Sequence, residues 1–222
     1  MQTALPFFKT TIGKKALMAV TGLILFGFVI GHMAGNLQIY LGAEKLNGYA
    51  EKLQSLGPLL WVVRAVLLSA LLVHLWAMLS LYGQSWSARE TRYKMKANSV
   101  TSYAAVTMWL SGPMILLFVL YHLAHFTFPG IAMGEYEHVH GAVYANVVNG
   151  FSVPWVAALY IAAQLILGLH LYHGSWSLMQ TLGIDAHPKH DARRRLVARL
   201  IALAIVVGNV SIPVAVLTGY IQ

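Results

Sequence analysis

Long apolar stretches, separated by shorter polar segments, dominate the sequence. Five stretches reach the roughly 20 predominantly apolar residues that a helix needs to cross a bilayer. They cover about residues 15–35, 58–82, 101–128, 152–178 and 199–221. Apart from residues at their edges, Arg64 is the only formally charged side chain inside them. The pattern predicts an all-α integral membrane bundle of five transmembrane helices.

Residues 43–57, between the first two stretches, mix apolar and polar side chains at helical spacing. Leu46, Tyr49 and Leu53 recur every three or four residues. This period predicts an amphipathic helix on the outer membrane surface, with an ordinary loop as the alternative. The connections are too short to fold as independent domains, so residues 1–222 are predicted to form one transmembrane domain.

Basic residues occur in alternate connections along the chain. The basic segments contain Lys9, Lys14, Lys15, Arg89, Arg92, Lys94, Lys96, Lys189, Arg193, Arg194, Arg195 and Arg199. The segment 36–57 balances two acidic against two basic residues, and 130–151 contains Glu135 and Glu137 with no Lys or Arg. The positive-inside rule therefore predicts a cytoplasmic N-terminus and a C-terminus outside. The net charge of +8 then reflects topology and gives no reason to expect nucleic acid, while anionic lipid and an acidic protein surface stay open as partners.

Composition narrows the class further. The chain is 58% hydrophobic and 10% charged, as expected of a polytopic membrane protein. It has no cysteine, which excludes disulfides, thiolate zinc sites and iron–sulfur ligation by this chain. The run from Ala16 to Gly35 is longer than the core of a signal peptide and contains His32, so it is predicted to be a retained helix.

Four of the five stretches carry a histidine at membrane depth, where a polar ring is costly and is expected to face the bundle interior. Counting about 1.5 Å per residue from the middle of each stretch puts His32 and His122 about 10 and 11 Å toward the outside. The same count puts His74 and His170 about 6 and 7 Å toward the cytoplasm. Two level pairs suit two b-type haems, because each iron takes one axial imidazole from either side of the ring.

Each histidine also has simpler explanations. A single intramembrane histidine can hydrogen-bond across a helix interface, although two depth-matched pairs argue against this for all four. His125 and His173 lie one turn beyond His122 and His170, so spacing alone leaves them as rival ligands. Glycines beside His32 suit the approach of a flat ring, but they suit close helix packing equally well; they are Gly27, Gly31 and Gly35.

Three motifs contain these histidines: TGLILFGFVIGHMAGN around His32, SGPMILLFVLYH ending at His122, and HLYHGSWSLMQTLGI beginning at His170. Together with His74 they resemble the di-haem cytochrome b subunit of succinate dehydrogenases and fumarate reductases over essentially the full chain. The family takes one haem ligand from each of its first four helices in this order. The resemblance therefore implies His32 and His122 as ligands of the outer haem iron, and His74 and His170 as ligands of the inner one. Its motifs also favour His122 and His170 over their rivals one turn away.

The resemblance implies a membrane-anchor subunit of a succinate:quinone oxidoreductase, a metal-binding component of the respiratory chain and the tricarboxylic acid cycle. Such subunits hold a flavoprotein and an iron–sulfur protein on the cytoplasmic side. They pass electrons through two haem b groups to or from a membrane quinone, and the di-haem type favours menaquinone. The chain is then expected in a bacterial cytoplasmic (inner) membrane, with the dicarboxylate chemistry left to the flavoprotein. The direction of the reaction and a dimer of the whole complex stay open.

Further polar residues can be placed within that family. Arg64 lies about 9 Å outside the centre of its helix and is expected to pair with a haem propionate, with snorkelling to the outer interface as the alternative. Glu44, Tyr49 and Glu51 are the candidates for the quinone site.

The fourth apolar stretch lacks a glutamate that some members of the resembled family have. Gly168 stands two residues before His170, where some members place a glutamate that helps protons cross the membrane. A proton path that depends on such a carboxylate is therefore not expected. Gln164, near the middle of the same stretch, is expected to hydrogen-bond either between the haem levels or to a neighbouring helix.

Two other functions stay open. The di-haem cytochrome of a hydrogenase or formate dehydrogenase shares bis-histidine helices but lacks this ordered set of motifs. A non-haem transporter, with histidines that relay protons or bind metal, leaves the depth matching unexplained. The succinate and fumarate family is favoured over both.

Overall fold

The described part of the molecule is built from helices. The computed structural model describes residues 6–88, 103–128, 138–185 and 187–222. Five helices are long and apolar enough to cross a membrane: α1 (Thr11–Asn36), α3 (Pro58–Ser87), α4 (Tyr103–Phe126), α6 (Pro154–Thr181) and α7 (Asp191–Leu217). The predicted all-α bundle of five spanning helices is confirmed. The predicted ends differ most at the start of α7, which begins in the basic segment.

Short helices connect the long ones. They are η1 (Phe7–Lys9), η2 (Leu37–Leu41), α2 (Ala43–Ser55), α5 (Val143–Phe151) and η3 (Pro188–His190). The amphipathic helix predicted at 43–57 is confirmed as α2, and its Leu46 is buried in the core. Helix α5 lies in a segment for which the sequence analysis specified no element.

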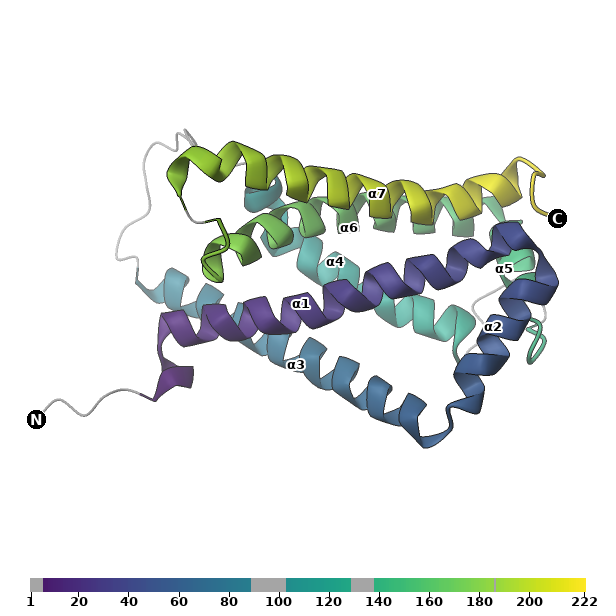
Figure 1. Ribbon diagram of the computed structural model, residues 1–222, viewed down its shortest axis with the longest axis horizontal. Helices are drawn as coiled ribbons and strands as arrows, with labels where there is room; N and C mark the ends of the chain where they lie inside the picture. Colours follow the sequence, from purple (N-terminus) through teal and green to yellow (C-terminus); the bar gives the residue numbers. More distant parts are fainter. Residues whose placement is uncertain (1–5, 89–102, 129–137, 186) are drawn as a thin grey trace, which may run out of the picture.

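The connections gather at two ends of an elongated bundle (Figure 1). Helices α2 and α5 and the C-terminus lie at one end, here called the α2 end. The start of α1 and the turn from α6 into α7 lie at the other, here called the basic end because it carries Lys9, Lys15 and Arg193. The basic residues Arg89, Arg92, Lys94 and Lys96 and the acidic residues Glu135 and Glu137 lie outside the described residues. The predicted orientation relative to the cytoplasm stays a prediction.

Local sequence signals explain where the helices begin. The Thr10 hydroxyl accepts a hydrogen bond of 3.0 Å from the Gly13 N–H and caps α1. Proline occupies the first position of α3 and of α6, where its missing N–H costs no intrahelical bond. Gly42 has a φ of 94°, a left-handed conformation that allows the chain to turn from η2 into α2.

The core lies mainly between α6, α7 and the elements of the α2 end. Ile39, Val156 and Ile212 belong to one buried cluster there. A smaller cluster in the middle of the bundle contains Leu171 and Ile205. Large apolar side chains elsewhere on the long helices are exposed, among them Trp61, Leu72, Leu117, Leu165 and Val207. This distribution suits helices whose outer faces meet lipid rather than water.

Two glycines allow the long helices to approach closely. A Cβ added to Gly168 on α6 would collide with the Val206 side chain of α7. A Cβ added to Gly208 on α7 would lie only 2.5 Å from the Met33 sulfur of α1. Small residues at such positions let neighbouring membrane helices pack backbone to backbone.

Candidate functional site

The outer pair of histidines meets between α1 and α4. The ring centroids of His32 and His122 are 5.7 Å apart, and the two ring planes are nearly perpendicular at 84°. Phe28, one turn before His32, stacks on its ring at 5.3 Å with an interplanar angle of 18°. The structure therefore brings together two side chains that are 90 positions apart in the sequence and that the depth count put at one level.

This separation fits two axial ligands of one metal ion. A metal–imidazole bond is about 2 Å long, so two nitrogens on opposite sides of a metal are about 4 Å apart. Each ring centroid lies roughly 1 Å behind its nitrogen, which gives about 6 Å between centroids. The 5.7 Å observed here is close to that value. The centroid separation of His32 and His122 is therefore compatible with ligation of one metal ion by both imidazoles.

The inner pair is held by two buried hydroxyls. His74 on α3 has its Nδ1 3.2 Å from the Thr21 hydroxyl of α1. His170 on α6 has its Nδ1 3.3 Å from the Ser111 hydroxyl of α4. His74 and His170 are also close enough to interact electrostatically. Four helices therefore contribute to the inner level, two through imidazoles and two through hydroxyls.

The other hydrogen bonds of the two hydroxyls favour one tautomer of each inner histidine. Thr21 donates its own hydrogen to the Leu17 carbonyl at 2.7 Å, so its oxygen is left to accept from Nδ1–H of His74. Ser111 donates to the Met108 carbonyl at 3.4 Å and can accept from His170 in the same way. Nδ1–H leaves the lone pair on Nε2, which is the form of imidazole that binds a metal ion. The contacts of Thr21 and Ser111 thus favour the tautomer in which Nε2 of each inner histidine carries the lone pair.

On both α1 and α4, the hydroxyl at the inner level and the histidine at the outer level are separated by the same number of residues. Thr21 precedes His32 by 11 residues, and Ser111 precedes His122 by 11 residues. Eleven residues are about three helical turns, so each hydroxyl lies within about 20° of the same face as its histidine and about 16 Å further along the axis. Helices α1 and α4 therefore present equivalent faces to the interior, with a hydroxyl at the inner level and a ligand candidate at the outer level.

The rival histidines have different surroundings. His125 is 5% exposed and packs on Phe126 with ring centroids 4.1 Å apart, and its Nδ1 is 2.9 Å from the Tyr160 hydroxyl. The same hydroxyl lies 3.3 Å from Nδ1 of His122. His173 makes an edge contact with the Trp176 ring at 5.8 Å. His122 and His125 thus both belong to the aromatic cluster around Tyr160, and His122 also lies against His32.

The backbone beside His32 has room for a flat ring. A Cβ added at Gly27 or Gly31 would meet no protein atom within 4 Å, and the same holds for Gly112 on α4. Gly27 and Gly31 are also exposed, so among the described residues they do not pack against another helix, and both explanations that the sequence left for them stay open. Gly35 differs, because a Cβ there would lie 2.6 Å from the Tyr49 ring.

Arg64 lies in the first turns of α3, which follows α2, with its guanidinium 4.8 Å from the ring centroid of Trp61. Both side chains are exposed, which suits the snorkelling alternative. A propionate partner for Arg64 stays a prediction.

Gln164 and Gly168 both serve the contact between α6 and α7. The Asn209 side chain donates a 3.0 Å hydrogen bond to Gln164 Oε1, so Gln164 binds the neighbouring helix. The Val206 side chain of α7 packs against Gly168 and occupies the space that a Cβ would need. The position that carries a glutamate in some members of the resembled family is therefore closed to a longer side chain here.

The quinone-site candidates lie on α2. Tyr49 packs its ring against Gly35, one turn after His32, and so lies near the outer histidine level. Glu44 and Glu51 are exposed at the surface of the α2 end. Tyr49 is therefore the candidate closest to the histidines, and a quinone-binding role for any of the three stays a prediction.

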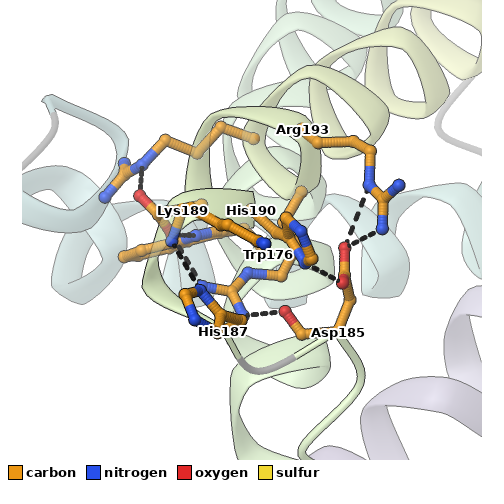
Figure 2. Close-up of polar contacts among 9 residues, drawn as sticks. Trp176, Asp185, His187, Lys189, His190 and Arg193 are labelled. Carbon is orange, nitrogen blue, oxygen red and sulfur yellow. Dashed lines mark hydrogen bonds and ion pairs between the residues drawn. The ribbon is translucent and has the colours of Figure 1, made fainter.

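A polar network closes the basic end where α6 turns into α7 (Figure 2). Asp191 accepts hydrogen bonds from the Trp176 indole at 2.9 Å and from Arg195 at 2.7 Å, and Arg195 stacks 3.9 Å over the Trp176 ring. Asp185 accepts a 3.0 Å hydrogen bond from Arg193 Nε and pairs with His190. The hydrogen bond from Arg193 holds the pKa of the Asp185 carboxyl below its usual value. The network stabilises the turn between α6 and α7, and it gives both Asp185 and Asp191 hydrogen-bond partners.

Sequence reasoning missed the hydroxyls that hold the histidines. Thr21, Ser111 and Tyr160 are unremarkable in an apolar helix, although an 11-residue spacing before two of the histidines was available as a signal. Compared with known proteins, the chain matches no family model, no curated protein and no solved structure. The family resemblance therefore rests on the motifs in the sequence.

Proposed function

We propose that this chain is the di-haem membrane anchor of a succinate:quinone oxidoreductase. The observation that carries the proposal is the pairing of His32 with His122, whose ring centroids are 5.7 Å apart, together with two further histidines, His74 and His170, whose Nδ1 atoms lie 3.2 and 3.3 Å from the hydroxyls of Thr21 and Ser111. A single intramembrane histidine has many uses. Two stacked pairs, each drawn from two helices, favour two stacked haems.

In this proposal the described residues bind and orient. His32 and His122 hold one haem near the α2 end, and His74 and His170 hold the other nearer the basic end. Haem supplies one-electron chemistry within a dry helix bundle, with potentials set by its axial ligands and their hydrogen bonds. Thr21 and Ser111 fix the rotation and tautomer of the inner ligands, a contribution that typically changes metal affinity 10- to 100-fold.

The two ends of the bundle receive different partners. The basic end faces the cytoplasm and carries the iron–sulfur and flavoprotein subunits, which fits its excess of Lys and Arg. The α2 end lies near the outer haem and binds the quinone, with Tyr49 as the residue nearest the histidines. Electrons then cross between the two ends without a charge being exposed to lipid.

Haem stoichiometry of the purified chain tests the ligand set. The wild-type protein is expected to contain two b haems by pyridine haemochrome, and His122→Ala is expected to contain one. His125→Ala is the matched control, because it removes an imidazole one turn away on the same helix and should leave two haems. Loss of a haem in the His125 variant with two retained in the His122 variant would contradict the assignment, and a colourless wild-type protein would favour the non-haem transporter.

The identity of the partners tests the wider function. A tagged chain purified from its native membrane is expected to carry a flavoprotein and an iron–sulfur protein and to couple succinate oxidation to quinone reduction. A nickel or molybdenum subunit in their place would assign the chain to a hydrogenase or formate dehydrogenase complex instead.

A further inference from the structure

Lys14 is buried although it stands in the first turns of α1. Its residue is 8% exposed, whereas the adjacent Lys15 is exposed. Burial of a lysine at a helix end is unusual, because the long side chain normally carries its ammonium group out to water or headgroups. Lys14 is thus largely covered by other parts of the chain, whereas Lys15 is not.

Lys14 shares a face of α1 with the residues of the candidate site. It precedes Thr21 by 7 residues and His32 by 18, which are about two and five whole turns. All three side chains therefore leave the helix within about 20° of one direction. Thr21 contacts His74 of α3, and the Lys14 ammonium lies 5.9 Å from the ring centroid of Trp76, two residues after His74. Lys14 therefore points toward the basic-end side of the inner histidines.

No acidic side chain in the described residues neutralises Lys14. The ion pairs of Asp185 are with His190 and Arg193, and those of Asp191 are with Arg194 and Arg195. Glu44 and Glu51 lie on α2 at the opposite end of the bundle. A cation–π contact at 5.9 Å offsets only part of the cost of burying an ammonium group.

We propose that Lys14 is the counter-ion for a carboxylate of the ligand that His74 and His170 hold. Lys14 is a buried cation on the histidine face of α1, beside the Trp76 ring and with no acidic neighbour in the described segments. Such a cation requires a nearby anion, and the bound ligand supplies it. The inference rests on the proposed function, in which this carboxylate is a propionate of the inner haem. Lys14 differs from Arg64, which is also predicted to pair with a haem propionate, because Lys14 lies on α1, near the inner histidine level, and is buried.

The test compares haem with its dimethyl ester, in which both carboxylates are blocked. Full-length chain is produced in a haem-deficient host in a His122→Ala background, so that the inner pair is titrated alone by absorbance. The parent chain should bind haem about tenfold more tightly than the ester. Lys14→Gln should bring the two affinities together, and Lys14→Arg should preserve the difference. Lys15→Gln is the matched control and should behave like the parent.

The outcomes separate this inference from the proposed function. Failure of the wild-type chain to bind haem would overturn the proposed function itself. Haem binding with a bis-histidine spectrum and an unchanged haem-to-ester ratio in Lys14→Gln would overturn only the role of Lys14. Phosphorus analysis of the purified protein then identifies the anion in that second outcome. If Lys14→Gln loses bound phospholipid while its haem-to-ester affinity ratio is unchanged, the partner of Lys14 is a lipid phosphate.

Discussion

Replacing Thr21 by valine isolates a single hydrogen bond at the inner histidine level. Valine has nearly the same shape as threonine, so the packing of α1 against α3 is kept while the hydroxyl is removed. The change removes the acceptor for His74 Nδ1–H, at 3.2 Å, and the donor to the Leu17 carbonyl, at 2.7 Å. The Met18 backbone, which also hydrogen-bonds His74, then remains as the partner of the ring on α1.

The magnitude follows from the burial of the site. Thr21 is 7% exposed, so the loss of a hydrogen bond at this buried position costs about 1–3 kcal/mol. At about 1.4 kcal/mol per factor of ten, this corresponds to a loss of roughly 10- to 100-fold in affinity for a ligand bound through Nε2. The same range is typical when the outer hydrogen-bond partner of a metal-binding histidine is removed. We therefore expect Thr21→Val to weaken haem binding at the inner site by one to two powers of ten.

The assay is an absorbance titration of haem-free protein with haem, followed by a reduced-minus-oxidised spectrum. Thr21→Ser keeps the hydroxyl and is expected to bind almost like the wild type. Thr21→Leu would confuse lost hydrogen bonding with overpacking and is not a useful comparison. Wild-type affinity in Thr21→Val, with Thr21→Ser unchanged as well, would refute the inference that the hydroxyl prepares His74.

Two further variants test the fold around the site. Gly168→Glu should lower the thermal stability of the chain in detergent by several degrees, because any Cβ at this position meets Val206, whereas Gly174→Ala, where a Cβ meets nothing within 4 Å, should have little effect. Asp185→Asn should lower the melting temperature at pH 7, and the difference from the wild type should shrink as the pH is lowered below 3.8. Folding lowers the pKa of Asp185 from its ordinary 3.8, chiefly through the hydrogen bond from Arg193, so its stabilisation is present above pH 4 and disappears as the pH falls through the folded-state value. An equal loss of stability at pH 7 and at a pH below 3.8 would contradict that account.

Helix positions were predictable because their causes are local. A run of about 20 apolar residues is sufficient to define a membrane span, and proline at the start of α3 and α6 marks two of the boundaries. The amphipathic helix α2 followed from the spacing of Leu46, Tyr49 and Leu53 in the same way. The start of α7 was placed too late, since its first turns are basic and hydropathy alone does not include them.

The partners of polar side chains were harder to predict. The sequence left two explanations for Gln164, and the structure selects a hydrogen bond to Asn209 on α7. It also left Arg64 with two explanations, and its exposed position over Trp61 favours the interface. Neither choice could be made from spacing, because α6 and α7 could meet in several rotational settings with the same apolar pattern.

The sequence by itself determined the number of long apolar helices and predicted the depths of the four histidines, because length, composition and rise per residue act along one helix at a time. Only the tertiary structure decided that His32 faces His122, that Thr21 and Ser111 hold the inner imidazoles, and that Lys14 lies buried on the same face as both levels. These facts depend on the rotation of each helix about its axis. Rotation is set by contacts between helices distant in sequence, such as Gly168 with Val206 and Gly208 with Met33, and no single segment contains that information.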